Sequence, residues 1–260
     1  MGYVIMIKKI KERLNRKLID LKYANAFSSA ASMCNAETFS DIKNIMNGKD
    51  LAICGGGPTL KDYKPINNVH HIALNRALLN NNVKYEYFIA DDWDGVYFFK
   101  DELEKYDCRK FFGHQINGEY NRQIPESFRI KCGAKRYYTD SFIGMSAFDC
   151  KFICDIDKMA IGNMPNIALS AMQIALFMNP RRIYLVGCDA SKGHYVQPKD
   201  LTEKDIQRHE KDLKMAVSSD QVIEKWKELK QFADAFYPDT EIVSINPVGL
   251  KGIFRDEYQD

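Results

Sequence analysis

The sequence lacks the paired cysteines and the charge excess that mark several large protein classes. Its seven cysteines are an odd number, no CxxC pair occurs, and the five histidines do not cluster with them at zinc spacing. This pattern argues against a disulfide framework and a structural metal, and it predicts reduced thiols in a cytoplasmic protein. A formal net charge of +2, with no long basic block beyond the N-terminus, gives no reason to expect a nucleic-acid partner.

The sequence also lacks an apolar run long enough to span a bilayer. The longest run, residues 167–178, is too short and too mixed for that role. At the N-terminus the apolar residues precede the charges, which is the reverse of a secretion signal. Residues 4–22 instead predict an amphipathic helix with many lysines and arginines. Two alternatives are open for this helix: packing on the domain, or peripheral contact with an anionic inner-membrane surface.

Apolar segments alternate with helical patterns along the rest of the chain. The predicted strands are residues 50–54, 70–75, 85–92, 109–114, 181–189 and 241–246. Helices are predicted at 94–106, 166–178, 201–216 and 220–236. Strands that are apolar throughout predict a mostly parallel sheet covered on both faces, which is a doubly wound, Rossmann-like α/β fold.

The division of the chain follows from the same pattern. Residues 1–48 are expected to form N-terminal helices, and residues 49–260 a single α/β domain. Residues 115–158 show no regular pattern and are rich in Tyr, Phe, Arg and Lys. We therefore expect an irregular lid or insert over 115–158.

Three glycines follow the first predicted strand. Gly55, Gly56 and Gly57 allow either a tight turn or the close approach of a ligand to the backbone. Ligands of doubly wound sheets bind at the carboxyl ends of the strands, where this turn lies. Pro58 and Thr59 come next, and the Thr59 hydroxyl could bind a phosphate or cap a helix. The segment is neither a Walker loop nor a GxGxxG fingerprint.

Polar side chains end the next two predicted strands. Asn75 carries an amide that can donate and accept, as recognition of a base or a ribose requires. Asp91 and Asp92 could hold Mg²⁺ on a diphosphate or accept hydrogen bonds from sugar hydroxyls. The alternative is that these acids merely favour the N-terminus of the following helix.

A second polar group follows the strand at 181–189. Gly187 and Asp189 end that strand, and Ser191, His194 and Tyr195 come within the next six residues. Because an imidazole titrates near neutral pH, His194 is the natural general base. His209, on a charged helix, is its competitor.

At this point the residues resemble two related bacterial groups. "ICGGGPTL" is similar to the G-[NG]-G-P-S-L turn of the CMP-sialic-acid-dependent sialyltransferases. It is also similar to the turn of a broader group of motility-associated glycosyltransferases, whose fold also occurs in an archaeal hydroxymethylpterin pyrophosphokinase. "NIALSAMQIALFMNPRRIYLVGCDAS" resembles their helix–strand–G-x-D block, and "HHIALN" their second strand. The likeness covers most of residues 49–196.

The resemblance implies roles for individual residues. Gly55, Gly57, Pro58 and Thr59 would lie against the nucleotide phosphates, and Asn75 would contact the cytidine or its ribose. Asp91 or Asp92 would replace an asparagine that faces the donor, and Gly187 and Asp189 would line the base and ribose pocket. The sialyltransferase stretch R-I-T-S-G reads "GNMPN" here, so Asn163 and Asn166 would replace its serine. The position of the family's histidine base is closer to His209 than to His194.

The resemblance also implies an activity. The expected enzyme transfers a sugar from a nucleotide donor, CMP-activated in the sialyltransferases, to a glycan acceptor of the bacterial surface such as lipopolysaccharide or capsule. It requires no cofactor and uses His194 or His209 as base, with Tyr195 on a lid, and homo-oligomers are known among the related enzymes.

Two alternatives remain open at this stage. The first is an ATP-dependent pyrophosphokinase that holds Mg²⁺ through Asp91, Asp92 and Asp189. The second is a non-catalytic nucleotide-binding protein of glycan assembly.

Overall fold

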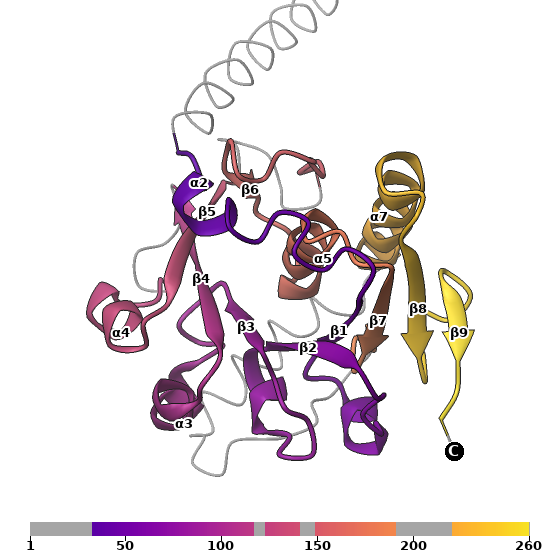
Figure 1. Ribbon diagram of the computed structural model, residues 1–260, viewed down its shortest axis with the longest axis horizontal. Helices are drawn as coiled ribbons and strands as arrows, with labels where there is room; N and C mark the ends of the chain where they lie inside the picture. The colour runs from indigo at the N-terminus through magenta and orange to yellow at the C-terminus, as the bar shows by residue number, and fades with distance from the viewer. Residues whose placement is uncertain (1–32, 117–122, 141–148, 191–219, 260) are drawn as a thin grey trace, which may run out of the picture.

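A single parallel sheet organises the molecule. The computed structural model describes residues 33–116, 123–140, 149–190 and 220–259. Within them nine strands form one sheet in the order β6-β5-β4-β3-β2-β1-β7-β8-β9, and every neighbouring pair is parallel (Figure 1). The strands are β1 (Asp50–Cys54), β2 (Val69–Leu74), β3 (Tyr87–Ala90), β4 (Arg109–Ile116), β5 (Lys135–Asp140), β6 (Ile161–Gly162), β7 (Arg182–Val186), β8 (Glu241–Ile245) and β9 (Arg255–Glu257). The predicted doubly wound α/β class is confirmed.

Helices cover both faces of this sheet. The α-helices are α2 (Ala36–Phe39), α3 (Lys100–Lys105), α4 (Glu126–Lys131), α5 (Ile167–Phe177) and α7 (Asp220–Phe236). Three short 3₁₀ helices follow strands: η1 (Pro58–Asp62), η2 (Asn75–Leu79) and η3 (Tyr97–Phe99). Leu51 and Ile53 of β1 face a core shared with α2, α5 and α7, whereas Ala52 and Cys54 face a second core shared with η1, η2 and α3. This alternation is why the strands read as continuous apolar runs.

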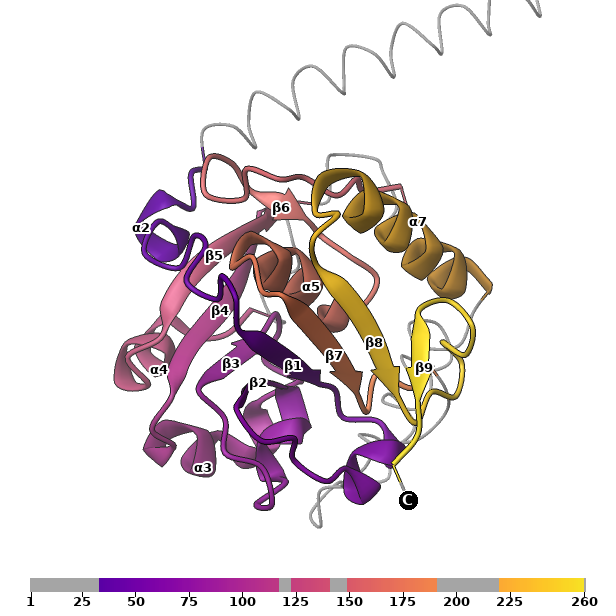
Figure 2. The ribbon, with the colours of Figure 1, turned by 45° about the vertical axis from the view of Figure 1, so that its right-hand side comes forward.

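The strand order creates one switch point. From β1 the chain adds β2 to β6 on one side, and then returns to place β7 on the other side of β1 (Figure 2). The loops after β1 and β7 therefore leave neighbouring strands in opposite directions. A crevice at the carboxyl ends of such a strand pair is where open α/β sheets bind ligands.

The irregular insert predicted over residues 115–158 is wrong in part. Helix α4 and strand β5 lie inside this range, and β5 takes an internal place between β4 and β6. Its side chains at Tyr137, Thr139 and Asp140 are buried although the segment begins with Lys135 and Arg136. The sequence did not predict this strand because it begins with two cations, whereas strand prediction relies on apolar runs.

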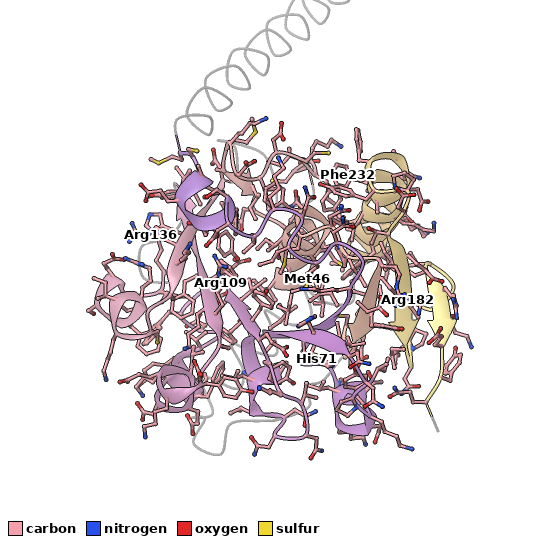
Figure 3. All side chains as sticks on the ribbon, in the orientation of Figure 1. Met46, His71, Arg109, Arg136, Arg182 and Phe232 are labelled. Atoms are coloured by element: carbon pink, nitrogen blue, oxygen red, sulfur yellow. The ribbon has the colours of Figure 1, made fainter. Side chains whose placement is uncertain are left out.

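The boundary predicted between residues 48 and 49 falls inside the packed unit. Phe39, Ile42 and Met46 are almost fully buried in the core that contains α5 and α7 (Figure 3). Asn35 donates to the backbone oxygens of Tyr138 and Met159, and so ties this segment to the region of β5. The α/β unit therefore includes residues before 49.

Other predicted elements differ in detail or lie elsewhere. The helix predicted over 94–106 is divided into η3 and α3, and the chain closes with the edge strand β9. The amphipathic helix predicted at 4–22 and the helix predicted at 201–216 lie outside the described residues. No helix in the described part of the chain combines the length and apolar character needed to cross a bilayer.

Candidate functional site

The glycine turn after β1 lies directly against the backbone that follows β7. The Gly55 N–H donates to the oxygen of Val186 at 2.7 Å, and the Gly57 N–H to the oxygen of Gly187 at 2.8 Å. A Cβ on Gly55 would lie 2.5 Å from the Gly187 oxygen, which is closer than a Cβ atom can approach without a shift of the backbone. Glycine is therefore needed in this turn because two loops meet closely at the switch point.

A side chain from the segment after β7 completes this contact. The Thr59 N–H donates to Oδ2 of Asp189 at 2.9 Å, and the Thr59 hydroxyl donates to Oδ1 of the same carboxylate. Asp189 is buried, with 5% of its surface exposed. Burial raises the pKa of Asp189, and the two hydrogen bonds from Thr59 oppose that rise. The pair joins the ends of β1 and β7, which neighbour each other only because of the strand order.

These bonds bear on the expected phosphate site. The resemblance implies that backbone amides of the turn face the nucleotide phosphates. In the structure the amides of Gly55, Gly57 and Thr59 all donate within the protein, and Pro58 has no N–H to offer. A phosphate on the Thr59 amide would have to displace the Asp189 carboxylate, which also repels it, whereas the amides of Gly55 and Gly57 donate to backbone oxygens.

Asn75 and Asp92 meet at the carboxyl ends of β2 and β3. A Cβ on Gly95 would lie 2.8 Å from Oδ1 of Asn75 and 2.9 Å from Oδ1 of Asp92. The Gly95 N–H donates to Oδ1 of Asp92 at 2.6 Å, which holds the turn in place. The Asn75 oxygen is shielded from solvent and has no hydrogen-bond partner within the described residues. A shielded acceptor of this kind calls for an explanation, and a bound ligand or a water supplies one.

Asp91, the neighbour of Asp92, points into the protein. The Tyr137 hydroxyl donates to Oδ1 of Asp91, and a Cβ on Gly113 would lie 2.5 Å from the same oxygen. Burial raises the pKa of Asp91 to about 7, the charge of Asp92 adds to the rise, and the Tyr137 hydrogen bond opposes it. The two aspartates that the sequence presents as equivalent therefore lie in different surroundings.

The aspartates do not form a metal site in the described residues. No group of three or more His, Cys, Asp or Glu side chains in those ranges is placed to hold a metal ion. Asp189 bonds to Thr59, whereas Asp91 bonds to Tyr137. The shared Mg²⁺ site that the pyrophosphokinase alternative requires of Asp91, Asp92 and Asp189 is thus not found among these ranges.

The remaining predicted residues divide into two groups. Asn166 caps α5, with its side-chain oxygen accepting from the Leu169 N–H at 3.2 Å, and the Asn163 N–H donates to the Asp140 oxygen at 2.9 Å. Gly56 is half-buried within the turn, and Gly187 has a φ of 59°, a left-handed conformation that favours glycine. The predicted catalytic and lid residues Ser191, His194, Tyr195 and His209 lie outside the described residues.

Sequence reasoning missed several residues around the site. The Gly249 N–H, in the loop after β8, donates to the Asp189 oxygen at 2.7 Å, and Gly95 makes room for Asn75 and Asp92. For both Gly249 and Gly95, the sequence feature that could have indicated the residue is a glycine shortly after a predicted strand. No sequence feature indicated Tyr137, because its strand falls in the segment that was predicted to be an irregular insert.

Comparisons with known proteins give structural neighbours only. The chain matches no protein-family model and no curated protein. The sialyltransferase CstII from Campylobacter jejuni, in complex with CMP-3FNeuAc, is 15% identical, with 75% of this chain and 80% of that chain covered and a TM-score of 0.44.

Two further neighbours have similar values. The monofunctional alpha-2,3-sialyltransferase Cst-I from Campylobacter jejuni is 15% identical, with 76% of each chain covered and a TM-score of 0.40. The MAf glycosyltransferase from Magnetospirillum magneticum AMB-1 is 13% identical, with 89% of this chain but 38% of that chain covered and a TM-score of 0.49.

Proposed function

We propose that the protein is a glycosyltransferase that binds a nucleotide sugar at the switch point between β1 and β7. The observation that carries this proposal is the oxygen of Asn75, which is buried, has no hydrogen-bond partner within the described residues, and lies beside the turns that end β2 and β3. The turn after β1 is adjacent, because the Asn80 amide of the same loop as Asn75 donates to the Leu60 oxygen at 3.2 Å. An acceptor enclosed in this way suits the amino group of a base or a ribose hydroxyl.

A CMP-activated sugar is the donor that we propose. The proposed reaction needs no metal ion, and the nucleotide phosphate would lie beyond the Thr59 amide, which already donates to Asp189. This choice of donor follows the resemblance of the glycine turn and the G-x-D block, and CMP is bound in solved sialyltransferase neighbours.

The proposed reaction is a direct displacement. An acceptor hydroxyl attacks the anomeric carbon and gives its proton to His194 or His209, while the bond from that carbon to the phosphate oxygen breaks. The nucleotide leaves with the bonding electrons, and the Tyr195 hydroxyl donates to it. The acceptor would be a growing surface glycan, lipopolysaccharide or capsule, reached from the cytoplasm with residues 4–22 on the inner membrane.

A thermal-shift screen over CMP, UDP, GDP, ADP and ATP, with and without EDTA, tests the proposal. A ligand that binds only the folded protein raises the melting temperature. We expect CMP to raise it equally in both conditions. A shift caused by ATP alone, and abolished by EDTA, would favour the pyrophosphokinase instead.

The chain offers a matched pair of variants for this screen. Asn75 has a φ of 47° and Asn68 a φ of 61°, so glycine fits either position without backbone strain. Asn68 is exposed and precedes β2 at its opposite end. We expect Asn75→Gly to abolish the CMP shift and Asn68→Gly to retain it. Equal CMP shifts in the two variants would show that Asn75 is not part of the CMP site.

A further inference from the structure

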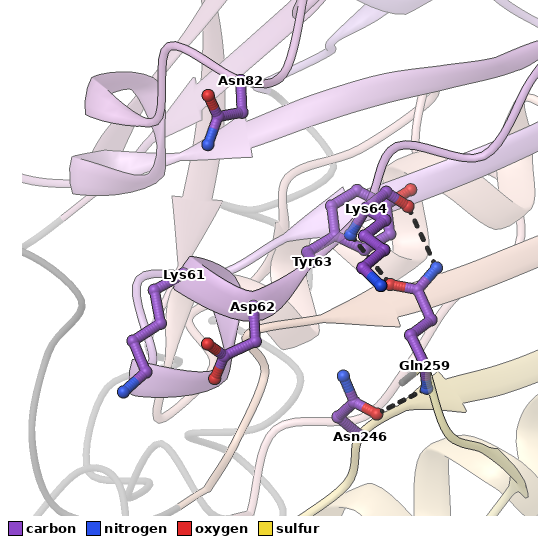
Figure 4. Close-up of a pocket in the computed structure, with 7 residues that line it drawn as sticks. All are labelled: Lys61, Asp62, Tyr63, Lys64, Asn82, Asn246 and Gln259. Carbon is purple, nitrogen blue, oxygen red and sulfur yellow. Dashed lines mark hydrogen bonds between the residues drawn. The ribbon is translucent and has the colours of Figure 1, made fainter.

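A pocket of about 630 Å³ lies beside the proposed donor site. Figure 4 shows it between η1, the loop that contains Asn82, and the segments that follow β8 and β9. Its polar lining consists of Lys61, Asp62, Lys64, Asn82, Asn246 and Gln259. The volume falls within the range of small-molecule sites, and the lining is unusually rich in amide and charged groups for such a pocket.

One wall of the pocket is held in place by hydrogen bonds. The side chain of Gln259 accepts from the Lys64 N–H at 2.9 Å and donates to the Lys64 oxygen at 3.0 Å. The Gln259 N–H donates to the Asn246 side-chain oxygen at 2.9 Å, and the Asn246 N–H donates to the Glu257 oxygen at 2.8 Å. The segment that contains Gln259 is thereby fixed to Lys64, two residues after η1, so this wall exists before any ligand arrives (Figure 4).

The buried pair Tyr63 and His71 supports the same wall. The Tyr63 hydroxyl lies 3.0 Å from Nε2 of His71, and Tyr63 is only 3% exposed. Tyr63 therefore lines the pocket itself and anchors the lining residues on either side of it. A preformed wall lowers the conformational cost of binding.

The opposite side of the pocket is exposed and chemically mixed. Lys61, Asp62 and Asn82 are all exposed to solvent. A carboxylate and an amide bind the hydroxyls of a sugar ring, and an ammonium group binds an anion. With two lysines against one aspartate, the lining carries a net positive charge. These groups suit a ring that carries hydroxyls and one negative charge.

The pocket and the proposed donor site share a structural element. Thr59, which bonds to Asp189, and Lys61, which lines the pocket, are two residues apart on η1. A molecule in the pocket would therefore lie next to the donor. We propose that the pocket binds a carboxylate-bearing sugar residue of the acceptor. This inference rests on the proposed glycosyltransferase function and names the chemical class of its acceptor.

Ligand-observed NMR titration of the full chain tests the inference, with glucuronic acid as the probe and glucose, acetate and inorganic phosphate as comparisons. We expect glucuronic acid to bind more tightly than any of these three. Lys61→Gln and Asn82→Ala should each weaken glucuronic acid binding by about fivefold, the scale of one exposed polar contact. Lys105→Gln, an exposed lysine on α3, should leave it unchanged.

The outcomes separate this inference from the proposed function. CMP binding should be the same in the wild type, Lys61→Gln and Asn82→Ala, because neither side chain belongs to the donor site. If CMP binds while glucuronic acid fails to bind, or binds equally to the wild type and both pocket variants, the pocket is not the acceptor site. Acetate or phosphate binding as tightly as glucuronic acid would show a simple anion site and overturn the sugar assignment.

Discussion

Asp189 accepts two hydrogen bonds from Thr59, a residue 130 positions earlier in the chain. The bonds connect the turn after β1 to the turn after β7, across the switch point of the sheet. They also use the N–H and the hydroxyl that Thr59 would otherwise offer to a phosphate. The same contact therefore fixes the shape of the crevice and restricts where an anion can bind in it.

The first prediction concerns the strength of this contact. Thr59→Val removes the hydroxyl that donates to the Asp189 carboxylate, and we expect the free energy of unfolding to fall by about 1–2 kcal/mol. Thr240→Val is the matched control, because the Thr240 hydroxyl donates to a neutral acceptor, the Pro180 oxygen, at 2.7 Å. Urea denaturation should show a smaller loss for Thr240→Val. A loss at Thr59 no larger than at Thr240 would contradict the charged bond.

The second prediction concerns the glycine turn. Gly57 has an ordinary φ of −70°, yet a Cβ there would lie 2.5 Å from Oδ2 of Asp189 and 2.6 Å from the Gly187 oxygen. Gly57→Ala should therefore separate the two turns, lower the melting temperature and weaken CMP binding. Gly48→Ala is the control, because Gly48 has a φ of 74° and open space around it, so only backbone strain of about 1 kcal/mol is expected. Equal effects of the two substitutions would show that the contact at Gly57 is unimportant.

Much of the fold could be predicted from the sequence because its central strands are apolar on both faces. The runs at β1, β2, β3, β4, β7 and β8 alternate between two buried cores, and each predicted strand overlaps the observed one. β5, β6 and β9 could not be predicted in this way. β5 begins with two cations, β6 has two residues, and β9 consists of Arg, Asp and Glu at the sheet edge.

The sequence predicted individual residues of the site but not how they contact one another. Thr59, Asn75, Asp92 and Asp189 were singled out because polar residues follow apolar strands, and the structure places each at a strand's carboxyl end. Their pairing was not predictable, since no local pattern shows that β7 returns beside β1. The orientation of Asp91 was also hidden, because it depends on Gly113 and Tyr137 in strands β4 and β5.

The third prediction separates Asp91 from the donor site. Its carboxyl faces Tyr137, whereas the Asn75 oxygen lies beside Asp92 and Gly95. Asp91→Asn keeps an oxygen that can accept from Tyr137, so we expect CMP affinity to stay within about twofold of the wild type. Isothermal titration with CMP and with Mg²⁺-ATP measures both ligands. Loss of Mg²⁺-ATP binding in Asp91→Asn would instead support Asp91 as a metal ligand.

The fourth prediction follows from the raised pKa of Asp91. Burial raises this pKa from 3.8 to about 7, so the folded protein holds a proton that the unfolded chain releases. The neutral carboxyl therefore stabilises the fold fully below pH 3.8, and this contribution is lost as the pH rises through about 7. The loss amounts to about 4–5 kcal/mol at most, at about 1.4 kcal/mol for each pH unit between 3.8 and about 7.

Urea denaturation between about pH 5 and 8 tests the direction of this effect. The residue as a whole is half-buried, but its carboxyl lies fully inside the protein, so substitution by a neutral amide should remove the titration. Asp91→Asn should thus lose less stability than the wild type as the pH rises, whereas Asp101→Asn, at an exposed position of α3, should follow the wild type. Tyr137→Phe removes the hydrogen bond that opposes the shift, so its loss of stability should extend to higher pH. Parallel curves for the wild type and Asp91→Asn would mean that this carboxyl stays ionised in the fold.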